Sequence, residues 1–109
     1  MSEPDPVLTF TAPLWRWQAR ATAEPGAWCF VTVPPRASQE IRELTDGFTR
    51  GFGSVRVEVE VGTSRWRTSV FPDGASGCYV LPVKRAVRTA QGVVEDDELT
   101  VTISVLDAG

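Results

Sequence analysis

Residues 55–71 read VRVEVEVGTSRWRTSVF, and this stretch decides the fold. Up to residue 61 every second residue is a valine, and beyond Gly62 and Thr63 the alternation resumes with Trp66 and Val70 on one face. A period of two predicts strands with one buried face. Because a glycine at the first central position suits a type II′ turn, the stretch predicts a β-hairpin.

The register of this hairpin follows from its turn. Val59 lies opposite Trp66 on the inner face. The outer face carries two pairs of opposite charge, Glu58 with Arg67 and Glu60 with Arg65. A slip by one residue would place the valines in water and mispair the charges, so the register is well specified.

The composition is typical of one globular domain, with 42% hydrophobic and 23% charged residues among 109. A net charge of −3 makes nucleic acid an unfavoured partner, because non-specific binding depends on neutralising phosphates with Lys and Arg. The chain has no histidine, which excludes His-based triads, His general bases and most zinc sites. We therefore expect neither a metal site nor a cofactor.

The N-terminal residues MSEPDPV contain no basic region and no apolar run, so no secretory signal is visible. No stretch approaches the roughly 18 apolar residues of a membrane-spanning helix. We expect a soluble, cytoplasmic protein. In that compartment Cys29 and Cys78 are expected to be reduced, packed thiols, and a disulfide between them is the alternative.

The chain before the hairpin predicts two strands and a helix. Alternation from Leu8 predicts a strand, in which Pro13 indicates an edge position or a bulge that shifts the phase. Residues 28–33 (WCFVTV) are apolar on both faces, which is typical of a central strand. Ser38 is the predicted N-cap of a short helix that stops at Gly47.

The chain after the hairpin predicts a strand, a helix and a last strand. Residues 78–83 form the strand, and residues 83–91 form a helix that stops at Gly92. In this helix Val83, Ala86 or Val87, and Ala90 are expected to face inward. Residues 99–105 alternate cleanly and form the last strand.

The predicted order is β-β-α-β-β-β-α-β, which is mainly β with two short helices. A small closed or half-closed barrel with helices at its ends hides the sheet edges best. We expect a single domain over residues 7–107, preceded by a disordered tail at residues 1–6.

Four segments carry a resemblance to a known family: FTAPLWRW, WCFVTVPP, residues 54–92 from SVRVEVEV to RTAQG, and EDDELTVTI. Together they resemble the bacterial family catalogued as domain of unknown function 1905. The most specific part is Arg-Trp-Arg-Thr-Ser, followed by Tyr-x-Leu-Pro-Val-Lys. The resemblance implies a small double-split β-barrel and transfers no catalytic residue.

Two positions depart from the family pattern. Where the family usually has a glycine before the acid in the last turn, this chain has Asp96 before Asp97, so we expect the positive φ of that turn on another residue. Position 78 is commonly small in the family and is Cys78 here. Neither departure is expected to change the fold.

A basic cluster is the best candidate for a binding site. Lys84 and Arg88 are four residues apart on the predicted helix and Arg85 lies between them, with Arg67 on the hairpin as a further member. Such a face can hold a phosphate or carboxylate. The alternative is ion pairing of these cations with Glu58, Glu60 and the acidic turn at residues 95–98, where each surface pair contributes about 1 kcal/mol at most.

Aromatic residues give a second candidate. The four tryptophans are mostly expected in the core, but Trp15 and Trp17 flank Arg16 and are the candidates for a surface groove or a dimer contact. Residues 50–55 (RGFGSV) resemble an RNA-recognition motif. They lack the aromatics that stack on bases, which favours a glycine turn instead.

These observations predict a non-enzymatic binding or interaction module for a small-molecule or protein ligand, with a small anion favoured. A dimeric DNA-binding protein is one alternative, because barrels of related shape include swapped-hairpin transcription factors. A small enzyme that uses only Arg, Lys and carboxylates is the other alternative. No catalytic constellation is visible for it.

Overall fold

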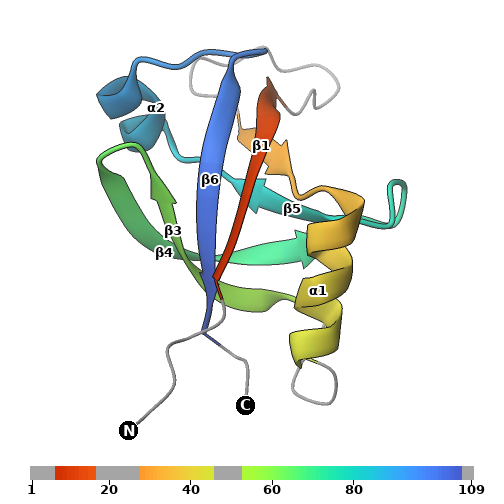
Figure 1. The fold of residues 1–109 in the computed structure, drawn as a ribbon. Helices are drawn as coiled ribbons and strands as arrows, with labels where there is room; N and C mark the ends of the chain where they lie inside the picture. Colours follow the sequence, from red (N-terminus) through yellow and green to blue (C-terminus); the bar gives the residue numbers. More distant parts are fainter. Residues whose placement is uncertain (1–6, 17–27, 46–52, 107–109) are drawn as a thin grey trace, which may run out of the picture.

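The computed structural model describes residues 7–16, 28–45 and 53–106, and every structural statement concerns these residues. The elements follow in the predicted order (Figure 1). They are β1 (Val7–Arg16), β2 (Cys29–Thr32), α1 (Pro35–Thr45), β3 (Val55–Val61), β4 (Ser64–Pro72), β5 (Tyr79–Pro82), α2 (Arg85–Gln91) and β6 (Glu98–Val105).

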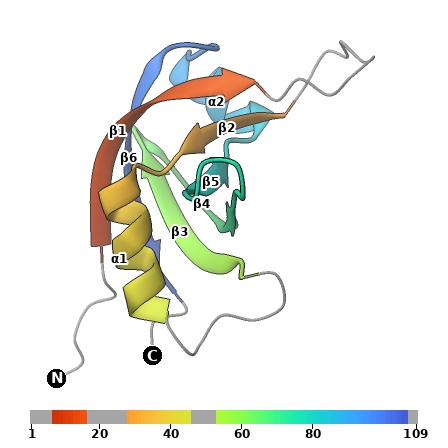
Figure 2. The same cartoon turned by 90° about the vertical axis from the view of Figure 1, so that its right-hand side faces the viewer.

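The strands form one closed antiparallel barrel in the order β1-β2-β5-β4-β3-β6, which confirms the predicted fold class. Each strand pairs with a neighbour on both sides over at least part of its length, which covers part of its edges. The helices lie at different places on the barrel, with α2 near the turn between β3 and β4 and α1 beside the end of β4 and the start of β5 (Figures 1 and 2). No helix in the described part of the chain is long and apolar enough to cross a bilayer.

The hairpin of β3 and β4 has the predicted register. Val59 pairs with Trp66 on the inner face. On the outer face Glu58 lies 3.5 Å from Arg67, and Glu60 lies 3.3 Å from Arg65. A type II′ turn requires a positive φ at its first central residue and a negative φ at its second. Gly62 has a φ of 58°, and Thr63 is not among the described residues with a positive φ.

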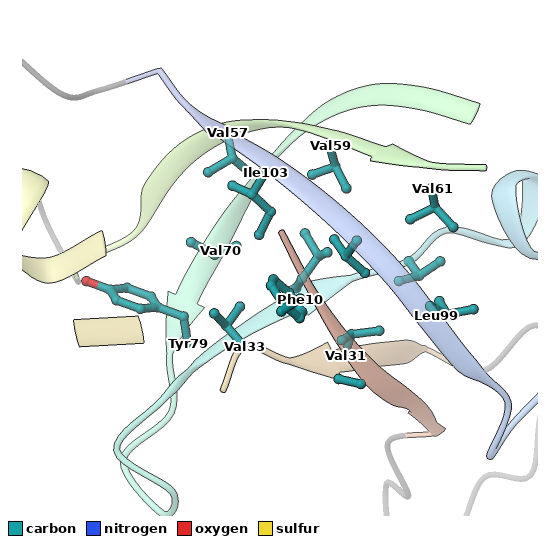
Figure 3. Close-up of a cluster of buried hydrophobic side chains, with 14 of the residues drawn as sticks. Phe10, Val31, Val33, Val57, Val59, Val61, Val70, Tyr79, Leu99 and Ile103 are labelled. Carbon is teal, nitrogen blue, oxygen red and sulfur yellow. The ribbon is translucent and has the colours of Figure 1, made fainter. Parts of the chain in front are cut away.

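The core lies inside the barrel, where buried residues alternate with less buried ones along the long strands (Figure 3). β3 contributes its four valines, and β6 contributes Leu99, Val101, Ile103 and Val105. Each such side chain contributes about 1.5–3 kcal/mol by leaving water. The prediction for residues 99–105 is therefore confirmed.

The predicted shift of phase at Pro13 is wrong. β1 keeps its alternation through Leu14, which is fully buried, so Trp15 points outward and is only half-buried. The N–H of Leu14 donates to the Asp97 carbonyl on the side of β6, so the nitrogen of Pro13 faces the other side. There β1 begins to pair with β2 only at Leu14, and the missing N–H of Pro13 leaves no ladder bond broken.

The predicted N-cap of the first helix is also wrong, because α1 begins at Pro35 and Ser38 lies inside it. Proline suits the first turn of a helix, where its missing N–H is not needed. The buried Ser38 hydroxyl instead donates to the Val33 carbonyl (2.8 Å) and accepts from the Tyr79 N–H (3.0 Å). Ser38 therefore joins α1 to the chain after β2 and to β5.

The second helix is shorter than predicted. It begins at Arg85, and Lys84 before it has an extended backbone. Val83 and Val87 are buried, but Ala90 is exposed, contrary to prediction. Gly92 ends the helix with a φ of 64°, as predicted.

The turn before β6 differs from the prediction in one residue. Asp96 itself takes the positive φ of 78°, so the strain falls on the residue that replaces the usual glycine. Cys29 and Cys78 are both buried, and no disulfide joins them. Several predictions concern residues that the structure does not describe: the tail at residues 1–6, Trp17, Gly47 and the motif residues 50–52.

Candidate functional site

A basic pocket of about 310 Å³ opens where β4 and β5 separate. The two strands pair only at Phe71 with Val80 and Pro72 with Tyr79. Beyond that point the pocket is lined by residues 66–68 of β4 and, around the start of α2, by residues 82–85 and Arg88. The structure thus brings all four sequence-predicted cations to one hollow: Arg67, Lys84, Arg85 and Arg88.

Different elements position these cations. Arg67 lies on the outer face of β4 and is exposed. Lys84 and Arg85 are exposed at the start of α2, where the Lys84 carbonyl accepts hydrogen bonds from the N–H groups of Val87 and Arg88. Arg88 is half-buried, and its Nε donates to the Val83 carbonyl (3.2 Å), which turns its side chain back toward the end of β5.

Two of the carboxylates that were the alternative partners of this cluster pair with other arginines. Glu60 pairs with Arg65, and Glu95 pairs with Arg16 at 3.8 Å. Of the cluster, Arg67 does pair with Glu58, at 3.5 Å. Within the described ranges no carboxylate oxygen lies within 4.0 Å of the side-chain nitrogens of Lys84 or Arg85. Among the residues that the structure describes, the ion-pairing interpretation therefore holds for Arg67, whereas Lys84 and Arg85 have no carboxylate partner.

An aromatic groove of about 530 Å³ lies next to the basic pocket. Four aromatic side chains line it together with Asp73, Val80 and Pro82: Trp15, Trp28, Phe30 and Phe71. Trp28 and Pro82 also line the basic pocket, so the groove and the pocket are contiguous. The groove lies on the outer surface of the barrel, because Trp28 is 64% exposed and Phe71 is 44% exposed.

The rings in the groove form a stack fixed at one end. The ring centroid of Phe30 lies 5.1 Å from that of Trp15 and 6.3 Å from that of Trp28, with interplanar angles of 29° and 17°. The Trp15 indole N–H donates to the Thr32 hydroxyl (2.9 Å), so this ring is fixed to β2. Offset stacking of this kind orders apolar rings at the surface.

Of the predicted groove aromatics, Trp15 lines the groove and Trp17 lies outside the described residues. The contribution of Trp28, Phe30 and Phe71 was missed. Residues 28–33 do show which positions share a face, since Trp28, Phe30 and Thr32 alternate with three small apolar residues. The sequence of that strand does not show which face the rest of the protein covers, and we expected both faces to be covered.

Metal-ligating side chains are not gathered in the part of the chain that the structure describes. Among the residues that the structure describes, no group of three His, Cys, Asp or Glu side chains can hold a metal ion. In the acidic turn Asp97 accepts a hydrogen bond from the Val94 N–H (2.9 Å), which uses its carboxylate within the turn.

The fold and its two hollows define a small antiparallel barrel with a basic pocket beside an aromatic groove. The chain belongs to the family described as domain of unknown function (DUF1905), which matches it over residues 10–103. This confirms the family expected from the residue pattern. A comparison with curated proteins finds no match.

Proposed function

We propose that this protein is a non-enzymatic binding module that recognises a small anionic ligand in the basic pocket. One observation carries the proposal: Arg67 of β4 and three cations around the start of α2 line the same hollow. They gather there although the chain as a whole has a net charge of −3. Such a local excess of positive charge attracts anions to one place on the surface.

The cations differ in what they offer a ligand. Arg85 presents a planar guanidinium that can hold two oxygens of a phosphate or carboxylate, and the Lys84 ammonium acts as a point charge. Because neither is paired with a carboxylate among the described residues, binding an anion breaks no existing ion pair. Arg67 supplies charge from across the pocket while it remains next to Glu58.

Thermal denaturation with a panel of anions tests this proposal. Phosphate, pyrophosphate and ribose 5-phosphate are each expected to raise the Tm of the wild-type protein, since a ligand that binds only the folded state stabilises it. The Lys84→Ala/Arg85→Ala variant is expected to lose this increase. Both residues are exposed and outside the core, so the variant should fold.

The matched control is Arg36→Ala/Arg65→Ala, which removes the same amount of positive charge away from the pocket. Arg36 lies on α1, and Arg65 pairs with Glu60 near the hairpin turn. If the control loses the response as fully as the pocket variant, the effect is one of net charge and the proposal is wrong. The proposal also fails if no anion stabilises the wild type.

We place this module in the cytoplasm, where phosphorylated and carboxylated metabolites are abundant. The dimeric DNA-binding alternative makes a different prediction for the same variants. A duplex that binds through the basic pocket would produce a gel shift at low salt that is lost at high salt. A shift that follows Lys84 and Arg85 while the small anions have no effect would replace the small-molecule proposal.

A further inference from the structure

The aromatic groove and the basic pocket follow one another along the outer face of a single stretch of chain. In β5 Tyr79 and Leu81 are buried, whereas Val80 and Pro82 point outward into the groove. The alternation continues past the strand, because Val83 is buried and the extended Lys84 points outward again. One molecule can therefore contact groove and pocket together along this face.

The spacing along this face sets the distance between the two contacts. Residues two apart in an extended chain are about 7 Å apart, so Lys84 lies about that far beyond Pro82. A ring above Phe30 and Pro82, which pair across β2 and β5, is thus separated from an anion at Lys84 by several bonds. A linker between the ring and the acid group spans this separation.

The groove presents the surface that a flat ring requires. Trp28 and Phe71 leave 64% and 44% of their area exposed, and Trp15 is fixed by its hydrogen bond to Thr32. Aromatic rings stack on such a platform whatever their substituents, because every ring has a π-face. The rings of Trp15, Phe30 and Trp28 already stack on one another, so the platform is formed without a ligand.

Charge gives the site a direction. Asp73 follows the end of β4, which pairs with the first half of β5, whereas Lys84 follows the end of β5. Asp73 therefore lines the groove at the end remote from Lys84. Its carboxylate is held by the Ser76 hydroxyl (2.9 Å) and the Ala75 N–H (3.4 Å). An anion is repelled at this end and attracted at the other. The ring therefore enters the groove with its acid group toward α2.

We propose that groove and pocket together bind a small molecule in which a flat aromatic ring is joined by a linker to a phosphate or carboxylate group. The ring stacks in the aromatic groove between Trp28 and Phe71, and the anion lies between Arg67, Lys84 and Arg85. This inference rests on the proposed function for its anionic half. The aromatic half is independent of it.

Calorimetric titration with matched probes tests the inference. Adenosine 5′-monophosphate carries ring and phosphate, and ribose 5-phosphate carries the phosphate alone. Indole-3-butyrate and butyrate form the corresponding carboxylate pair. In each pair the aromatic member is expected to bind about tenfold more tightly or better, which is the affinity that one stacked ring contributes. The pair that binds more tightly identifies the acid group.

Two variants separate the halves of the site. Trp28→Ala is expected to abolish the advantage of the aromatic probes, so that each binds no more tightly than its non-aromatic partner. Lys84→Ala/Arg85→Ala is expected to weaken every probe. The control is Val94→Ala, because Val94 is a similarly exposed apolar residue (66%) that lines neither hollow.

The outcomes distinguish this inference from the proposed function. Equal affinities within each pair, or an aromatic advantage that survives Trp28→Ala, would overturn the inference and leave the anion proposal standing. Absence of binding by all four probes would overturn both.

Discussion

The side-chain amide of Gln91 donates a 2.8 Å hydrogen bond to the hydroxyl of Ser64, joining the last residue of α2 to the first residue of β4. The same amide nitrogen lies 3.1 Å from the Thr63 hydroxyl. Because α2 carries Arg85 and Arg88 and β4 carries Arg67, this contact links the two sides of the basic pocket. The hairpin that defines the fold thus also positions the candidate site.

Gln91→Ala is expected to lower the free energy of unfolding by about 0.5–1.5 kcal/mol, the usual contribution of a partly buried hydrogen bond. It should also weaken the binding of ribose 5-phosphate, since α2 loses its tie to β4. Urea denaturation and calorimetry measure the two effects. Gln39→Ala, which removes an exposed 3.3 Å bond to Glu43, is the control. Unchanged ligand affinity in Gln91→Ala would show that α2 needs no such tie.

Gly62→Ala tests the turn of the hairpin. The φ of 58° is unfavourable for any residue with a Cβ, by about 1–2 kcal/mol, and a Cβ here would also collide with the Gln91 amide oxygen. We expect a loss of at least that size in chemical denaturation. Gly74→Ala is the matched control, because no atom lies within 4 Å of its Cβ position and its φ is not positive. Equal stability of the two variants would contradict the assigned turn.

Asp96→Gly is expected to stabilise the protein by about 0.5–1 kcal/mol. The residue has a φ of 78°, and glycine adopts this conformation without the steric cost that a Cβ carries. The gain is smaller than the full cost because glycine also raises the entropy of the unfolded chain. Thermal unfolding of Asp96→Gly beside Asp96→Ala, which keeps the strain, measures the effect. A lower Tm for the glycine variant than for the alanine variant would refute the explanation.

Ser38→Ala tests the link from α1 to the barrel. The substitution leaves the Tyr79 N–H without its hydroxyl acceptor in a buried place, which costs about 1–3 kcal/mol. Thr9→Ala serves as the control, since its 3.2 Å bond to Thr102 is exposed and its loss should cost under about 0.5 kcal/mol. Urea midpoints of the two variants give the comparison. Similar losses in the two variants would mean that the buried hydrogen bonds of Ser38 contribute no more to stability than the exposed bond of Thr9.

The hairpin was predictable because three local signals agree. The valine alternation, the Gly62 turn and the two outer ion pairs all require one register, and the structure has it. Gly92 was predictable for the same reason, since a helix end that needs a positive φ favours glycine. Where a single pattern served alone, as at Pro13, the prediction of a shifted strand was wrong.

The candidate site was predictable only in part, because it depends on partners far away in the sequence. Arg67 and Lys84 share a pocket because β4 and β5 pair only at Phe71 with Val80 and at Pro72 with Tyr79. No local sequence pattern shows where this pairing ends. Lys84 was assigned to a helix face, yet it precedes the helix. The exposure of Trp28 likewise follows from which neighbours β2 acquires in the barrel.

The most direct test of the anion site is a two-dimensional ¹H–¹⁵N NMR titration of the wild-type protein with ribose 5-phosphate. The account predicts saturable shifts that are concentrated at residues 66–68 and 83–88 and that disappear in the Lys84→Ala/Arg85→Ala variant. Shifts that cluster elsewhere, for example on α1, or that persist unchanged in the variant would contradict it.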